Sequence, residues 1–137
     1  MLSRSNWAHT ALERLKKLHA WKEHIIPLVR ATWNILPNAK VYVYGDAAED
    51  RLTALSDIDV LIVDTSIPAD PKDRMELKSR LWRRAEEYGV PWDYPFDILL
   101  LTPEEFEKFK KHIRILIEVS ELESNITFNA YPIHTLK

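Results

Sequence analysis

Apolar side chains in the first third of the chain recur at steps of three and four residues, the spacing of one helix face. Pro27 interrupts this pattern. Because proline lacks an N–H and disfavours helix at the residue before it, we expect a break or kink there. The pattern predicts a helical segment over residues 1–38. Its apolar positions are Ala11, Leu15, Leu18, Trp21, Ile25, Val29, Trp33 and Leu36.

Three short apolar runs in the middle of the chain are typical of β-strands. They span residues 40–44 (KVYVY), 58–63 (IDVLIV) and 96–101 (FDILLL). The second is nearly continuous in apolar character, as in a central strand. Between the second and third runs, a helical pattern begins at Pro71 and ends at Gly89, which has the position of a helix C-cap.

The C-terminal part of the chain begins with a clear helix start. Thr102 and Glu105 form a capping box before a helical pattern. Residues 113–119 alternate as a strand would, but the helical period before them favours a continued helix. From Ser124 onward no period is visible, so we expect a loosely ordered tail. The order of elements predicts an α/β (α+β-like) chain with a small mixed sheet covered by helices.

The length of 137 residues fits one domain, with a helical segment at 1–38, a core at 39–120 and a tail at 121–137. The formal charge of -2 argues against a protein whose main task is to bind a nucleic-acid backbone, although one local basic patch stays open. The absence of cysteine excludes disulfides, a thiol nucleophile and a thiolate zinc site. The start of the chain lacks the apolar stretch of a signal peptide, and no run has the length of a membrane span. We expect a cytoplasmic protein with no membrane contact.

Two carboxylates at the start of the central strand are the first candidates for chemistry. Asp57 and Asp59 are separated by one residue, and alternate strand residues point to the same face. Two carboxylates side by side resist joint ionisation unless a cation lies between them. Such oxygen ligands suit Mg²⁺ or Mn²⁺. The alternative is an N-cap or turn pair at a strand start.

A third carboxylate, Asp97, is the second residue of the FDILLL run. A charge in such a run is costly to bury without a partner. If this strand is next to that of Asp59, the three carboxylates meet at one metal site. The alternative is a carboxylate at a strand edge that pairs with Arg or Lys. Asp93, in the segment PWDYP, is a weaker rival in a loop.

Gly45 ends the first predicted strand and opens the polar stretch before Asp57. Bare backbone N–H groups at such a point can hold a phosphate, and glycine allows a close approach. Glycine at a simple turn is the alternative. We group Gly45 with Asp46, Arg51 and Ser56 as candidate nucleotide-binding residues.

These motifs resemble those of the minimal nucleotidyltransferases of the DNA polymerase beta superfamily. The family motif has Gly-Ser, a short helix, Asp-x-Asp and a third Asp on a later strand. Here Asp57 follows Gly45 by twelve residues, and the match continues through Ser56-Asp57-Ile58-Asp59-Val60 to Asp97. The resemblance covers about half of the chain, from Val41 to Phe109, and implies the nucleotidyltransferase fold.

The resemblance also implies a reaction and a role for each matching residue. A nucleoside monophosphate would be transferred from a nucleoside triphosphate, such as ATP, to a hydroxyl acceptor. Asp57 and Asp59 would bind both metal ions, and Asp97 would bind the catalytic metal and help to deprotonate the acceptor. Gly45 would contact the triphosphate. Small members of the family often work beside a helical partner, in the style of a toxin–antitoxin pair.

The chain departs from the family motif at Asp46, which stands where serine is usual. An added anion weakens binding of a triphosphate. This departure keeps a second hypothesis open, in which a catalytically degenerate nucleotidyltransferase fold binds a partner, in an antitoxin-like way, or senses nucleotides. Trp7, Trp21 and Trp33 predict either core packing or a subunit interface, as in a homo-oligomer.

Overall fold

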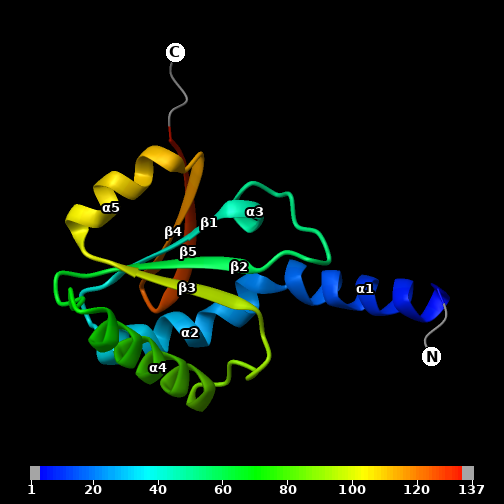
Figure 1. Ribbon diagram of the computed structural model, residues 1–137, viewed down its shortest axis with the longest axis horizontal. Coiled ribbons are helices and arrows are strands. Elements are labelled where there is room, and N and C mark those ends of the chain that lie inside the picture. The colour runs from blue at the N-terminus through cyan, green and yellow to red at the C-terminus, as the bar shows by residue number, and fades with distance from the viewer. Residues whose placement is uncertain (1–3, 134–137) are drawn as a thin grey trace.

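The N-terminal third of the protein forms two helices. The structure is a computed structural model that describes residues 4–133 (Figure 1). Helices α1 (Arg4–His19) and α2 (Trp21–Ile35) meet at Ala20, which confirms the predicted helical segment. Of the predicted break or kink at Pro27, the break is wrong, because α2 continues through this residue, and the kink stays a prediction. Ile25 and Leu28 are fully buried on either side, and this apolar burial offsets the hydrogen bond that proline removes.

Five strands form one mixed sheet in the order β3-β2-β1-β4-β5. Strands β2 and β3 are parallel, and the other neighbouring pairs are antiparallel. All three predicted strands are present with the predicted bounds. The strands are β1 (Lys40–Tyr44), β2 (Ile58–Val63), β3 (Phe96–Leu101), β4 (Ile115–Leu122) and β5 (Asn125–Pro132).

Helices α4 and α5 begin where the sequence predicts. Asp70 accepts hydrogen bonds from the first backbone N–H groups of α4, and the Thr102 capping box opens α5. These caps satisfy N–H groups that have no partner within the helix. The helices are α3 (Gly45–Ala48), α4 (Pro71–Glu87), α5 (Pro103–Phe109) and the short 3-10 helix η1 (Lys110–His112).

The expectation of a continued helix over residues 113–119 is wrong. Helix α5 ends at Phe109, and residues 115–122 form β4. β4 lies between β1 and β5, so it forms hydrogen bonds along both edges. The alternating pattern is the correct signal, because Leu116 is buried on one face of the sheet and Val119 on the other.

The expectation of a loosely ordered tail is also wrong over residues 125–132. These residues form β5, which pairs with β4 along its whole length from Ile115↔Pro132 to Leu122↔Asn125. Glu123 and Ser124 join the strands, with φ of 51° and 68°. Positive φ at both turn positions suits a tight hairpin. The last residues of the predicted tail, 134–137, lie outside the described residues.

Helices cover the two faces of the sheet unequally (Figure 1). Ile58, Val60 and Ile62 of β2 are fully buried in the larger apolar cluster, together with side chains of α2 and α4. The alternate residues Leu61 and Val63 belong to a smaller cluster on the α5 side. The fold is the α/β arrangement that the sequence predicts, a small mixed sheet with helices packed on it.

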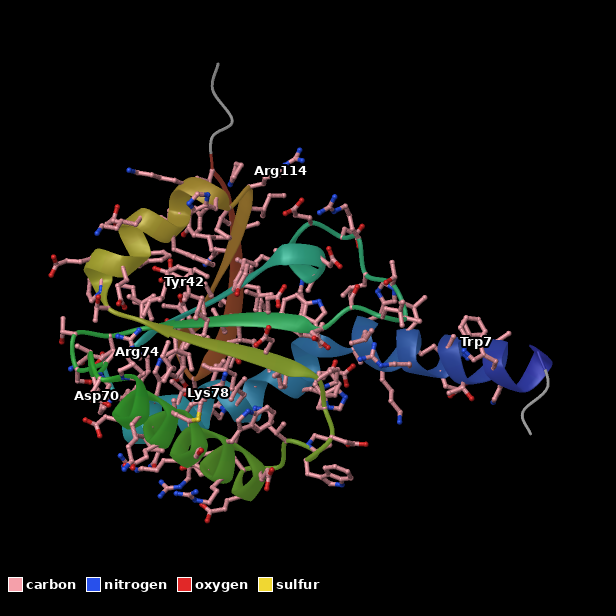
Figure 2. All side chains as sticks on the ribbon, viewed as in Figure 1. Trp7, Tyr42, Asp70, Arg74, Lys78 and Arg114 are labelled. Carbon is pink, nitrogen blue, oxygen red and sulfur yellow. The ribbon has the colours of Figure 1, made fainter. Side chains whose placement is uncertain are left out.

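Two labelled side chains show how the α5 side is closed (Figure 2). Tyr42 of β1 stacks on Phe106 of α5, with ring centroids 4.9 Å apart. Arg74 of α4 donates to the Leu100 carbonyl at 3.1 Å and to Glu105 of α5 at 3.1 Å. The pKa of Glu105 is lowered, first by its hydrogen bond from the Thr102 backbone and then by Arg74. α5 is therefore tied to both the sheet and α4.

The tryptophans predicted for the core or for an interface divide between the two roles. Trp21 is buried and packs edge-on against Phe128 of β5. Trp33 donates a hydrogen bond to the Ala39 carbonyl at 2.9 Å. Trp7 is 67% exposed on α1, which extends away from the sheet (Figures 1 and 2). Within residues 4–133, no helix is both long and apolar enough to cross a membrane.

Candidate functional site

Two of the predicted carboxylates lie next to each other on neighbouring strands. Asp59 of β2 and Asp97 of β3 are register partners in the parallel pair. Register partners point to the same face of a sheet, with strands about 4.8 Å apart. From the sequence, the carboxylates meet only if these two strands are neighbours. The sheet order shows that they are.

Tyr44 of β1 extends this pair to a row of three side chains. It is the register partner of Asp59 in the antiparallel pair of β1 and β2. The row Tyr44–Asp59–Asp97 therefore crosses three strands on the α5 side of the sheet. Tyr44 also packs edge-on against Phe109 of α5, with ring centroids 5.3 Å apart. The row lies where the smaller apolar cluster ends and polar side chains begin.

The electrostatics of this row disfavour further negative charge. The pKa of Asp59 is raised to about 6, first by burial and then by the carboxylates of Asp97, Asp57 and Asp46. The pKa of Tyr44 is raised to about 12 by burial, then by Asp59 and Asp97. The charges that raise both pKa values are carboxylates, so a cation at this place would favour the ionised form of Asp59.

Position 45 requires glycine because it lies against the Asp59 side chain. Its φ is +71°, a region that side chains with a Cβ rarely adopt. A Cβ on Gly45 would overlap with Oδ2 of Asp59. The glycine of the motif therefore lets α3 begin directly against the central carboxylate of the row.

Asp57 lies one residue before β2, and an arginine from α1 holds the backbone beside it. The Asp57 side chain is 55% exposed, and its Oδ1 lies 3.6 Å from Nη2 of Arg14. Nη1 of Arg14 donates to the carbonyls of Ala54 and, at 3.0 Å, of Ser56. Sequence reasoning missed Arg14, because nothing in the helical pattern distinguishes it from other charged helix residues.

Asp46 and Ser56 form a bond that anchors α3. Oγ of Ser56 donates to Oδ2 of Asp46 at 2.9 Å and accepts from the Thr53 N–H at 2.9 Å. Arg51 lies 3.8 Å from Asp46 Oδ1 and 3.3 Å from Glu49. Ser56 is only 6% exposed. Asp46 and Ser56 therefore connect α3 to the loop before β2, and their contact with a nucleotide stays a prediction.

The donor set fits a hard divalent cation by its chemistry, although its present conformation is not a finished ligand shell. Asp57, Asp59 and Asp97 supply only carboxylate oxygens, which suit Mg²⁺ or Mn²⁺. Among the residues that the structure describes, no three His, Cys, Asp or Glu side chains are arranged to hold a metal ion. Asp57 faces Arg14 instead, so it would have to turn toward the row to complete a site.

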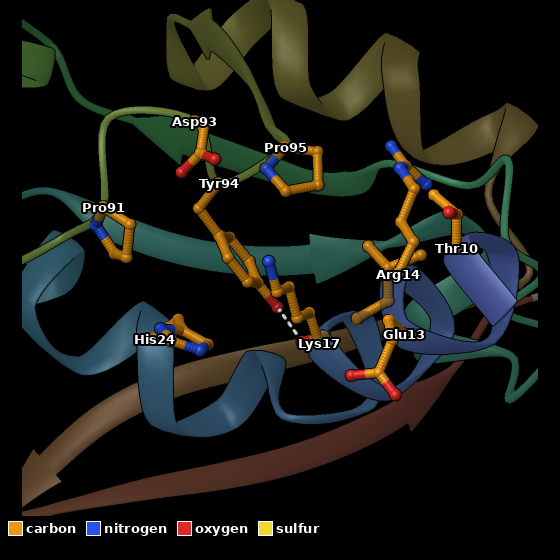
Figure 3. Close-up of a pocket in the computed structure, with 10 residues that line it drawn as sticks. Thr10, Glu13, Arg14, Lys17, His24, Pro91, Asp93, Tyr94 and Pro95 are labelled. Carbon is orange, nitrogen blue, oxygen red and sulfur yellow. Dashed lines mark hydrogen bonds between the residues drawn. The ribbon is translucent and has the colours of Figure 1, made fainter. Parts of the chain in front are cut away.

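The rival carboxylate Asp93 lies in a different place. It lines a cleft of about 450 Å³ between α1 and the loop before β3 (Figure 3). Across this cleft, the Tyr94 hydroxyl donates to the Lys17 carbonyl at 2.7 Å. Arg14 lines the cleft as well as contacting Asp57. The cleft therefore adjoins the loop of Asp57 through one side chain.

Comparisons with known proteins add one likeness. No protein-family model matches the chain, and no curated protein matches it. Among solved structures, it is similar to a 1.40 Å crystal structure of a "putative nucleotidyltransferase" from Sulfolobus solfataricus. The two share 21% sequence identity and a TM-score of 0.43, over 74% of this chain and 78% of that chain.

Proposed function

We propose that the protein transfers a nucleoside monophosphate from a nucleoside triphosphate to a hydroxyl acceptor, with Asp57, Asp59 and Asp97 as its metal-binding carboxylates. The observation that carries this proposal is the pairing of Asp59 with Asp97 on adjacent parallel strands. Two further observations support it. Neighbouring carboxylates contribute to the raised pKa of Asp59, and Gly45 leaves no room for a side chain beside Asp59.

The three carboxylates would hold Mg²⁺ or Mn²⁺. The bound cation would neutralise phosphate charge and increase the acidity of the acceptor hydroxyl. Asp97 is exposed, so it can accept the hydroxyl proton. The acceptor oxygen then forms a bond to the α-phosphorus, the bond between this phosphorus and the bridging oxygen breaks, and pyrophosphate leaves.

The other motif residues would prepare the triphosphate side of the site. Gly45 lets the backbone of α3 come close to Asp59, and hence to a phosphate held there. Asp46 and Ser56 fix the start of α3, while Arg51 is the basic neighbour that partly balances Asp46. In this proposal Ser56 acts through Asp46, because its own hydroxyl is buried.

Calorimetry tests the proposal directly. Purified protein is titrated with ATP, GTP, CTP and UTP in the presence of Mn²⁺, and an Asp57→Asn, Asp59→Asn double variant is the comparison. We expect metal-dependent binding of a triphosphate that the double variant loses. Asp93→Asn is the matched control, because this carboxylate lies in the cleft and should leave binding unchanged. Absence of binding by the folded wild type would contradict the proposal.

Asp46 favours a second candidate function, a degenerate site that binds a partner or senses nucleotides. Its carboxylate would repel a triphosphate held at Gly45, and Ser56 and Arg51 fix its position. Asp46→Ser removes this charge, and Asp46→Asn removes it while keeping an acceptor for Ser56. A gain in triphosphate binding in both variants favours the degenerate site. A loss in both variants shows that Asp46 belongs to a working site.

Partners beyond the nucleotide stay predictions from the resemblance. A helical protein partner, as in a toxin–antitoxin pair, needs an exposed contact surface, and Trp7 on the extended α1 is one exposed aromatic residue. Self-association through the same residue is the alternative. Sedimentation of the wild type against Trp7→Ala distinguishes them, because only a homo-oligomer changes mass in the absence of other proteins.

A further inference from the structure

The loop between α3 and β2 carries Asp57, and it lies outside the helices and strands. Residues 49–57 connect these two elements, and Leu55 in this loop is 90% exposed. Within the loop, the Ser56 N–H donates to the Thr53 carbonyl at 3.1 Å. Ser56 in this loop is buried and bonded to Asp46, whereas its neighbours Leu55 and Asp57 are exposed, and exposed segments open more easily than buried ones. The position of Asp57 therefore depends on what ties this loop to the rest of the protein.

Arg14 of α1 makes such a tie from a distant part of the chain. Its Nη1 donates to the carbonyls of Ala54 and Ser56, and its Nη2 faces Asp57. One guanidinium group thus contacts three of the four residues from 54 to 57. The two carbonyl bonds fix the backbone, whereas the ion pair at 3.6 Å between partly exposed side chains contributes little by itself.

We infer that Arg14 is a positioning residue of the carboxylate site, supplied by a helix outside the catalytic motif. It acts through the backbone of residues 54–56, which sets where Asp57 can place its carboxylate. This inference rests on the proposed function for its purpose, because a fixed Asp57 matters only if the carboxylate binds a ligand. The contact itself is a property of the fold.

The geometry of the contact requires arginine rather than a positive charge alone. Two nitrogens of one planar group serve two carbonyls and a carboxylate. Lysine carries a single ammonium group at the end of a flexible chain, so it cannot reproduce this fork. Arg14→Lys should therefore hold the loop less well than arginine but better than Arg14→Ala. If only the positive charge mattered, Arg14→Lys would hold the loop as well as the wild type.

Amide hydrogen exchange without metal or nucleotide tests the structural half of the inference. We compare the loop peptide over residues 51–57 in wild type, Arg14→Ala, Arg14→Lys and Lys16→Ala. Alanine keeps the helix, and Lys16 is a matched control because it lies on α1 and pairs only with Glu13 among the described contacts. We expect about tenfold faster exchange in Arg14→Ala, a smaller increase in Arg14→Lys and none in Lys16→Ala. Equal exchange in Arg14→Ala and Lys16→Ala would overturn the inference.

A Mn²⁺ titration of the same variants tests the functional half. A positioning role predicts weaker Mn²⁺ binding in Arg14→Ala, with partial recovery in Arg14→Lys. Stronger binding in Arg14→Ala would show that Arg14 competes with the cation for Asp57, and would overturn the positioning role. If wild type binds no Mn²⁺, the proposed function fails, while the exchange experiment still decides whether Arg14 holds the loop.

Discussion

The two faces of β2 show how one strand serves both stability and chemistry. Ile58, Val60 and Ile62 are fully buried against α2 and α4, whereas Asp59 shares the opposite face with Leu61 and Val63. Along this strand, the face covered by α2 and α4 contains only apolar side chains. On the α5 face, Asp59 comes first along β2 and belongs to the row Tyr44–Asp59–Asp97, and the apolar residues Leu61 and Val63 follow it. Alternation therefore places the Asp59 carboxylate outside the larger apolar cluster, where it removes no apolar contact from that cluster.

The largest expected loss of stability comes from the face of the sheet that α2 and α4 cover. Leu81 of α4 is fully buried in the larger cluster. Leu81→Ala should lower the free energy of unfolding by about 2–5 kcal/mol, because it removes apolar contacts and leaves a cavity. Met75→Ala on the same helix is the control, since Met75 is 69% exposed and should change stability by less than about 0.5 kcal/mol. Denaturant unfolding measures both, and similar losses would contradict the closed packing of this face.

The next effect comes from the contact between Gly45 and the row. Gly45→Ala places a Cβ against Asp59 in addition to the strain of its positive φ, so we expect a loss of about 2–4 kcal/mol. Gly89→Ala is a control within the chain, because Gly89 also has a positive φ but a Cβ added there would meet no atom within 4 Å. Thermal unfolding should show a larger loss for Gly45→Ala. Equal losses would mean that the added contact with Asp59 costs no more than the difference in backbone strain between a φ of +71° and one of +114°.

The smallest of the three expected changes in stability is an increase. The pKa of Asp59 is about 6 in the folded protein and near its ordinary value of 3.8 in the unfolded chain, so the folded state binds more protons between these values. Stability therefore falls as pH rises from about 4 to about 6, and the penalty persists above pH 6. Asp59→Asn removes it and should stabilise the metal-free protein at pH 7 by about 1–3 kcal/mol.

A pH series of melting temperatures checks this prediction. The stabilisation by Asp59→Asn should be present above pH 6 and should fade below about pH 4, where Asp59 is protonated in both states. Loss of stability in Asp59→Asn at pH 7 would show that the carboxylate is held by favourable contacts rather than strained by its neighbours.

Local rules place Asp59 and Asp97 each within its own strand, but they name neither Tyr44 nor the contact of Asp57 with Arg14. Alternation in a strand places Asp59 on the opposite face from Val60, and the apolar run around Asp97 identifies a second buried strand. That the two strands are neighbours is a matter of topology, so the sequence can state it only as a condition. The motif predicts a phosphate approach at Gly45, whereas the contact of Gly45 with Asp59 depends on how α3 folds against β2.

Apart from the break at Pro27, the predictions that failed, and the residue that was missed, depend on contacts between elements. β4 and β5 are strands because they pair with each other and β4 pairs with β1, which outweighs the weak local helical period. Arg14 contacts Ser56 across 42 residues, and no spacing rule connects a helix residue to such a loop. Likewise, the Ser56 bond to Asp46 becomes visible only when α3 and the loop are placed together.

NMR of the aspartate carboxyl carbons tests the central claim most directly, because it observes Asp59 and Asp97 themselves. The spectra are recorded against pH with and without Mg²⁺, and Asp59→Asn and Asp97→Asn assign the signals. We predict that Asp59 titrates near pH 6 without metal, and that Mg²⁺ lowers this pKa and shifts the signals of Asp59 and Asp97 together. Titration curves that are the same with and without Mg²⁺ would contradict a metal site at this row.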